Sequence, residues 1–137
     1  MEVAQHNIAH LVEDIYVLET GVFYFCKDFI ISEINEGIHF TWEDAQEIIA
    51  IAYEHYGKEK KISYISNRIN KYSVRPQDWI KFFTEDHNLE NYAIVAYDKI
   101  SYAQAAIENL FFKSRMGRFE NLALAIQWVQ EMNQKSA

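Results

Sequence analysis

The chain has 137 residues, half of them hydrophobic and 15% aromatic, which is enough to build a single domain over residues 1–137 with an ordinary core. Its 20 acidic and 13 basic side chains give a formal charge of −7, which disfavours nucleic acid as a partner. A lone cysteine excludes an internal disulfide, and no apolar run approaches the roughly 20 residues of a membrane-spanning helix. With no signal-peptide pattern at the start, the expected location is cytoplasmic.

The first part of the chain predicts an antiparallel meander. Residues 1–11 are expected to be a loose or helical lead-in, and extended β-branched and aromatic segments follow at 14–19, 22–26 and 29–34. Thr20-Gly21 and Lys27-Asp28 connect them. These connections are too short for crossovers, so neighbouring strands should pair antiparallel.

After Gly37 the pattern alternates between helices and short buried strands. Thr41 caps a helix that Gly57 ends, and a second helix is expected to begin at Pro76. A third helix is expected to begin at Ser101, with Gln104 completing a capping box, and a fourth to cover 121–132. Buried strands are expected at 62–65 and 92–97, and 114–119 is either an edge strand or a loop. The order predicts an α/β domain with a mixed sheet: antiparallel N-terminal strands, then parallel βα units, with about four helices.

A search for catalytic and cofactor motifs finds none. The chain contains no nucleophile elbow, and its four scattered glycines cannot build a phosphate-binding loop. His6 and His10 have the i,i+4 spacing of metal ligands, with Glu13 as a third candidate, but a solvated face explains them better. Cys26 lies in an apolar run and is expected to be a buried hydrophobe. We therefore expect no enzyme activity, no metal and no cofactor.

One basic segment stands out in this acidic chain. Residues 66–76 follow the strand at 62–65 and precede a helix, which places them beyond the carboxyl end of a parallel strand, where ligands of open α/β sheets bind. The segment could hold an anion, accept a phosphate on Ser73, or dock an acidic partner; the alternative is that its charges solvate a turn. The candidate binding residues are Arg68, Lys71, Tyr72, Ser73 and Arg75. A second basic group, Lys113, Arg115 and Arg118, is more typical of a solvated connection.

The chain also carries more aromatic rings than its helical stripes need. In Phe82-Phe83 and Phe111-Phe112 the two rings cannot both point inward, because neighbouring helical residues lie about 100° apart. These four rings could line an apolar pocket or form a homodimer surface. The alternative is that both helices are broadly buried.

Two segments, one near the first helix and one at the last helix, resemble a known family of protein domains. The run Glu36-Gly37-Ile38-His39-Phe40-Thr41-Trp42-Glu43-Asp44-Ala45 resembles the strand–Gly–helix entry of SpoIIAA-like, STAS/SEC14-type domains, and 119–129 resembles the closing helix of that group. With Ile94-Val95-Ala96 between them, the resemblance covers about residues 12–133. It implies a mixed sheet flanked by helices, and regulatory protein binding or, in some relatives, small or lipidic ligands. Phosphorylatable members carry an Asp-Ser pair before the second helix; Tyr72-Ser73 lies there, with Tyr in place of Asp.

The sequence thus predicts a non-enzymatic, cytoplasmic binding or regulatory module that docks a protein partner through the 66–76 segment. The alternative is an apolar small-molecule or lipid-binding protein whose pocket is lined by Phe82, Phe83, Phe111 and Phe112.

Overall fold

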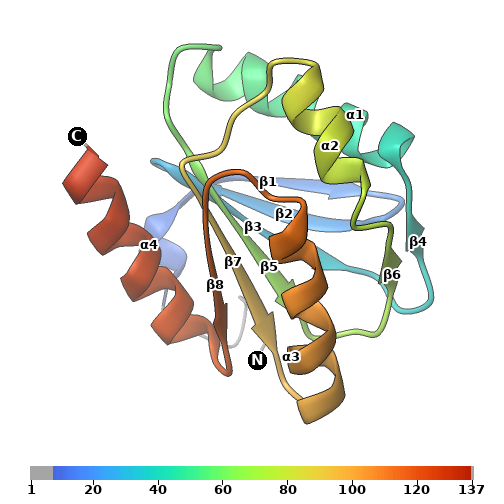
Figure 1. Ribbon diagram of the computed structural model, residues 1–137. Helices are drawn as coiled ribbons and strands as arrows, with labels where there is room; N and C mark the ends of the chain where they lie inside the picture. Colours follow the sequence, from blue (N-terminus) through green and yellow to red (C-terminus); the bar gives the residue numbers. More distant parts are fainter. Residues whose placement is uncertain (1–7, 137) are drawn as a thin grey trace.

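The main sheet of the protein has six strands in the order β1-β2-β3-β5-β7-β8, within residues 8–136 that the computed structural model describes (Figure 1). Their bounds are β1 Val12–Leu18, β2 Gly21–Cys26, β3 Phe29–Ile34, β5 Ser63–Arg68, β7 Asn91–Ala96 and β8 Arg115–Phe119. β1 is preceded by a short 3-10 turn, η2 (Ala9–Leu11). The remainder of the expected lead-in, residues 1–7, lies outside the described residues.

The pairing of neighbouring strands changes once across the sheet, from antiparallel to parallel. β1, β2 and β3 form an antiparallel meander, whereas β5 pairs in parallel with β3 and β7, and β7 in parallel with β8. The meander is tight at Gly21, where an added Cβ would lie 2.4 Å from the carbonyl oxygen of Glu33 on β3. The predicted mixed sheet, with antiparallel strands first and parallel βα units after them, is confirmed.

Helices cover both faces of this sheet. α4 (Leu122–Ser136) packs on one face, against residues such as Ile31, Ile65 and Val95. The other face carries α1 (Trp42–Tyr56), α2 (Asp78–Thr84), and α3 (Lys99–Ala105) with its 3-10 continuation η3 (Ala106–Leu110) (Figure 1). None of the helices in the described range is both long enough and apolar enough to span a bilayer.

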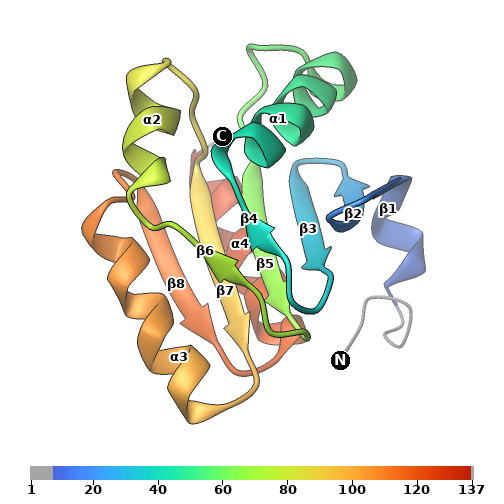
Figure 2. The same ribbon diagram turned by 90° about the vertical axis from the view of Figure 1, so that its right-hand side faces the viewer.

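A two-stranded parallel ribbon lies on the same side as α1 and α2. β4 (His39–Phe40) pairs with β6 (Ser73–Val74), two short strands that the sequence analysis did not anticipate. Figure 2 shows the ribbon in front of the main sheet, with α1 and α2 above it. The ribbon brings the chain that enters α1 beside the chain that enters α2.

Several predicted boundaries were wrong. α2 begins at Asp78, because Pro76 lies in the turn before it, where the carbonyl oxygens of Arg75 and Pro76 accept from Asp78 and Trp79. α3 begins at Lys99, because Asp98 is the cap: its carboxylate accepts from the backbone and hydroxyl of Ser101. α4 continues past the predicted end at 132, and segment 114–119 contains the edge strand β8.

α1 follows its prediction closely. The Thr41 hydroxyl accepts from the Asp44 backbone at 3.2 Å, and the Asp44 carboxylate accepts from the Thr41 backbone at 2.9 Å, a reciprocal capping box. Gly57 ends the helix with a φ of 81°. Yet no residue of α1 is fully buried, although its apolar stripe faces the sheet.

Candidate functional site

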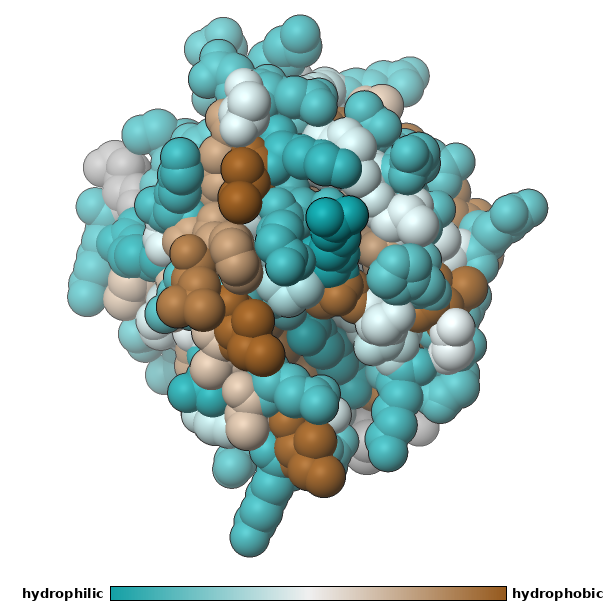
Figure 3. Space-filling model, turned by 45° about the vertical axis from the view of Figure 1, so that its right-hand side comes forward, coloured by the Kyte–Doolittle hydropathy of each residue, from teal (hydrophilic) through white to brown (hydrophobic). Residues whose placement is uncertain are grey.

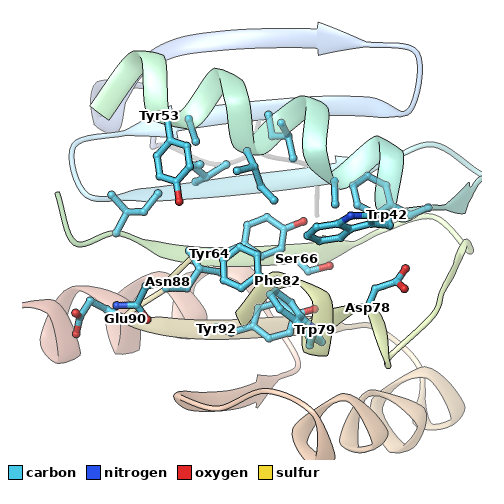
Figure 4. A pocket seen from close by; sticks show the side chains of 18 of the residues that line it. Trp42, Tyr53, Tyr64, Ser66, Asp78, Trp79, Phe82, Asn88, Glu90 and Tyr92 are labelled. Atoms are coloured by element: carbon cyan, nitrogen blue, oxygen red, sulfur yellow. The ribbon is translucent and has the colours of Figure 1, made fainter. Parts of the chain in front are cut away.

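A pocket of about 330 Å³ lies between α1 and the main sheet. The strands β3, β5 and β7 supply one wall, α1 the opposite wall, and α2 with the residues after it closes the side. Figure 4 shows Trp42 and Tyr53 on α1 facing Tyr64 and Tyr92 on the strands, with Trp79 and Phe82 on α2 beside them. The volume is at the lower end of the range for small-molecule sites, about 300–1,000 Å³.

The part of the pocket formed by α1, β3 and the β4–β6 ribbon is mostly hydrophobic. α1 contributes one stripe at helical spacing, and β3 and the small ribbon add aliphatic and aromatic side chains. These residues are Ile30, Ile34, Phe40, Trp42, Ala45, Ile48, Ile49, Ala52 and Val74. Charged residues at the pocket margin belong to the 58–61 segment and to the entry and exit of α2.

β5 brings polar side chains into this hydrophobic setting. Side chains alternate along a strand, so Tyr64, Ser66 and Arg68 share the face toward the pocket, while Ile65 and Asn67 lie on the face toward α4. The neighbouring strand β7 places Tyr92 beside Tyr64, and their rings stack with centroids 5.5 Å apart.

Glu108, a buried carboxylate on η3, is the centre of a polar cluster that we define as Ser66, Arg68, Tyr72, Trp79, Tyr92 and Glu108. One carboxylate oxygen accepts from the Tyr92 hydroxyl at 2.8 Å and from the Trp79 indole at 3.0 Å. The other pairs with Nη2 of Arg68 at 2.5 Å. Only 4% of the Glu108 side chain and 15% of the Arg68 side chain are exposed, so this is a largely buried ion pair.

Arg68 links the rest of the cluster. Its Nη2 also donates to the Tyr92 hydroxyl and its Nε donates to Ser66 Oγ, both at 3.0 Å. Ser66 Oγ lies 2.8 Å from the Tyr72 hydroxyl, and the guanidinium lies over the Tyr72 ring. Burial alone lowers the pKa of Arg68, but Tyr72, Tyr92 and Glu108 raise that pKa well above its ordinary value, so the side chain is a permanent cation.

The tyrosines of the sheet wall are held neutral. Burial raises the pKa of Tyr64 and of Tyr92 above the ordinary range, and Glu108 raises the Tyr92 pKa further. The Tyr64 hydroxyl lies 2.6 Å from Ser32 Oγ. Both phenols therefore keep their protons and serve as hydrogen-bond groups at neutral pH.

The structure divides the predicted basic segment instead of keeping it as one loop. The expectation that residues 66–76 form a loop was wrong at its start, because β5 runs through Arg68, and at Ser73–Val74, which form β6. Arg68 and Tyr72 belong to the polar cluster, whereas Lys71, Ser73 and Arg75 are exposed. The Ser73 hydroxyl lies 2.7 Å from Nδ1 of His39 across the ribbon.

Of the four phenylalanines expected to line a pocket, one does so. Phe82 lines it, while Phe83 and Phe112 pack against Trp79 with ring centroids 6.3 and 4.8 Å away. Phe111 is half-buried at the end of η3, away from the pocket lining. A 3-10 segment, η3, forms the last part of this helical region and leaves Ile107 and Leu110 exposed.

The other sequence candidates lie apart from the pocket. His6 is outside the described residues, and His10 is exposed on η2. Arg118 donates to the Tyr102 carbonyl oxygen and lies over the Tyr102 ring, so it braces α3 against β8. Cys26 is 1% exposed, which confirms it as a buried hydrophobe, and burial raises its pKa to about 12.

Sequence reasoning missed Glu108, Tyr64 and Tyr92. Glu108 lies between Ile107 and Asn109 in a helical pattern, and nothing local marks it as buried. The alternation Tyr64, Ser66, Arg68 was the available signal, since polar side chains on every second residue of a buried strand indicate one polar face.

The fold and the pocket together define an α/β protein of SpoIIAA-like fold with a cavity the size of a small molecule. No family model and no curated protein sequence matches the chain. Among solved structures it is similar to the crystal structure of an uncharacterized protein of the DUF3478 family with a SpoIIAA-like fold, from Shewanella loihica PV-4. The match has a TM-score of 0.52 at 13% identity and covers 85% of this chain and 90% of the other. At this identity the likeness establishes the fold, which confirms the resemblance inferred from the sequence at the level of fold.

Proposed function

We propose that this protein binds a small, largely hydrophobic molecule in the pocket between α1 and the sheet, and that it acts by binding and not by catalysis. The observation that carries the proposal is the pocket itself: about 330 Å³, walled by hydrophobic side chains and bounded on the sheet side by the polar cluster. Hydrophobic walls with a few convergent polar groups are the usual composition of ligand sites.

The packing of α1 supports this proposal. α1 is tied to the rest of the molecule near its C-terminus, where the Tyr56 hydroxyl lies 2.5 Å from the Cys26 carbonyl oxygen and the Tyr53 hydroxyl 2.5 Å from Nδ1 of His87. Along its middle, Ala45, Ile48 and Ile49 face the pocket and are only half-buried. A hydrophobic ligand would complete the burial of this stripe, which is worth about 25 cal/mol per Å² of apolar surface removed from water.

Binding without catalysis is supported by the pairing of the polar groups. Both oxygens of Glu108 already accept hydrogen bonds, and Arg68 is neutralised by it. Among the described residues that line the pocket, Ser66 bonds Arg68 and Tyr72 and has no histidine or carboxylate as a base.

Docking of a protein partner, expected from the basic segment, keeps Lys71, Ser73 and Arg75 as its exposed candidates. This mode stays a prediction. Reversing the charge of Lys71, which lies outside the pocket lining, would weaken partner recovery if the surface docks an acidic protein, without affecting the pocket.

A pocket-filling variant tests the proposal. Ala52 lines the pocket from α1, and Ala50 is exposed on the same helix. In a titration with Nile red, an uncharged hydrophobic dye, we expect saturable binding with a blue-shifted emission. Ala52→Phe should weaken it by about tenfold or more, because the ring occupies the ligand volume, and Ala50→Phe should leave it unchanged.

If Ala52→Phe and Ala50→Phe are both folded by circular dichroism and Ala52→Phe binds the dye as tightly as wild type, the pocket is not the binding site. Native mass spectrometry of gently purified protein gives an independent check, since a retained small molecule should be lost from Ala52→Phe and kept by Ala50→Phe.

A further inference from the structure

We propose that the molecule bound in this pocket is uncharged and presents a hydrogen-bond acceptor, such as a carbonyl or ester oxygen, to the polar cluster. This inference rests on the proposed function and adds the chemical class of the ligand. It follows from two properties of the cluster: it has hydrogen-bond donors to spare, and its charges cancel.

Arg68 supplies the first hydrogen-bond donors that have no partner within the cluster. A guanidinium carries five N–H groups. Three are used, by Ser66 Oγ, the Tyr92 hydroxyl and Glu108. The two on Nη1 meet no acceptor among residues 8–136, and Arg68 lines the pocket. A ligand oxygen is the group that would pair with them.

Two hydroxyl pairs add further donors. Ser66 and Tyr72 share one hydrogen bond, as do Ser32 and Tyr64. In each pair one hydroxyl donates to the other, so one hydrogen remains without an acceptor in the described part of the chain. The Ser66–Tyr72 pair keeps that hydrogen at the pocket whichever hydroxyl donates, and the Ser32–Tyr64 pair does so where Ser32 donates to Tyr64. Tyr64, Ser66 and Tyr72 all line the pocket. The phenols stay protonated at neutral pH, because burial raises the pKa of Tyr64. The sheet wall therefore offers donors for an acceptor group.

Charge decides between a neutral acceptor and an anion. Arg68 is the cation of the cluster, and the Glu108 carboxylate is paired with it. An ionised ligand would approach Arg68 and Glu108 together, so attraction and repulsion would largely cancel. It would still lose its hydration in a mostly hydrophobic pocket, which is costly for an uncompensated charge. A carbonyl or ester oxygen gains the same donors and loses far less hydration.

The experiment compares methyl octanoate with octanoate, which share the chain and differ in charge. Trp42 and Trp79 line the pocket, whereas Trp128 packs against Phe119 on the α4 side, so tryptophan fluorescence reports binding. At neutral pH we expect the wild-type protein to bind the ester at least about tenfold more tightly than the carboxylate.

Glu108→Gln sharpens the test by leaving Arg68 uncompensated while keeping the size of the side chain. In this variant we expect octanoate to gain at least about tenfold in affinity, with little change for the ester. Glu120→Gln is the matched control: it removes an exposed acid outside the pocket lining and should leave the preference unchanged.

Octanoate binding to the wild type as tightly as the ester would overturn the inference and leave pocket binding intact. Failure of both probes and of Nile red would overturn the proposed function and the inference with it. The wild-type comparison decides even if Glu108→Gln does not fold.

Discussion

Arg68 illustrates how the surroundings of a single side chain determine its role. The same residue would be a docking group on an exposed loop, but on β5 its guanidinium pairs with Glu108 and braces Ser66 and Tyr92. Removing one partner of such a buried pair leaves an uncompensated charge, a change that costs about 3–5 kcal/mol. Arg68 therefore acts as part of the pocket wall.

Cys26 gives a prediction at the same scale. It is the only cysteine, lies 1% exposed on β2, and its pKa is raised to about 12 by burial and by nearby Glu13 and Asp28. The thiolate is the reactive form, so we expect a disulfide reagent such as DTNB to label folded protein about a hundredfold or more slowly than protein in concentrated urea. The absorbance of the released thiolate measures both rates. Equal rates in the two states would show that the thiol is accessible.

The two long helices attach to the sheet in different ways. α1 has no fully buried residue and stands across the pocket, whereas α4 buries Leu122, Ala125 and Val129 completely. α4 is also fixed by Asn133, beyond the predicted end of the helix, whose side chain reaches β5, β7 and the β2–β3 turn. Close packing against the sheet therefore holds α4, while α1 is held by a partly buried stripe and by hydrogen bonds near its C-terminus.

Asn133 allows a test of this anchoring. Its Oδ1 accepts from Ser63 at 2.7 Å and from Asn91 at 3.0 Å, and its Nδ2 donates to the Asp28 carbonyl oxygen at 3.2 Å. Asn133→Ala leaves the fully buried Asn91 amide without that acceptor, so we expect a loss of about 1–3 kcal/mol in the free energy of unfolding. Urea titration measures it. The control Gln134→Ala, at an exposed position on the same helix, should stay within about 0.5 kcal/mol of wild type.

An Asn133→Ala protein as stable as the control would mean that the anchoring hydrogen bonds contribute no net stability.

For the whole molecule, the two faces of the sheet carry different kinds of packing. The α4 face is a close-packed core, and the opposite face combines aromatic packing with the pocket and the polar cluster. On the outside, Ile80 on α2 and Ile100, Ile107 and Leu110 on the α3–η3 segment are exposed, as are Ile15 and Val17 on β1 and Leu124 on α4. Figure 3 shows hydrophobic side chains in a band across one side of the molecule. The homodimer surface expected from excess aromatic rings stays a prediction.

Alkaline pH should destabilise the whole fold. Burial raises the folded-state pKa of Cys26, Tyr56, Tyr64 and Tyr92, so these groups stay neutral in the folded protein while the unfolded chain ionises. Their stabilising effect is complete below the unfolded pKa values, about 9 for the thiol and 10 for the phenols, and is lost as pH rises through the folded values. Each such group lowers the free energy of unfolding by about 1.4 kcal/mol per pH unit in that window.

Urea midpoints measured across this alkaline range test whether the free energy of unfolding falls as pH rises. A midpoint that stays constant or rises above pH 10 would contradict neutral burial of these phenols.

The amino-acid sequence by itself determined the features that depend on neighbouring residues. The short connections Thr20-Gly21 and Lys27-Asp28 require an antiparallel meander. Thr41 caps the start of α1 and Gly57 ends it. The apolar run around Cys26 places this residue in the core. Helix starts were less certain, since Asp98 and Ser101 are both good caps and only the folded backbone selects between them.

Tertiary structure alone decided the pocket and its polar cluster. Ser66, Tyr92 and Glu108 belong to β5, β7 and η3, and meet only because a parallel sheet sets distant strands side by side. The same packing turned Arg68 from a surface charge into a paired one and turned Phe112 away from the pocket toward Trp79. Hydrophobic periodicity specifies which face of an element is buried, but whether that face meets a side chain, a carboxylate or a cavity depends on the element packed against it.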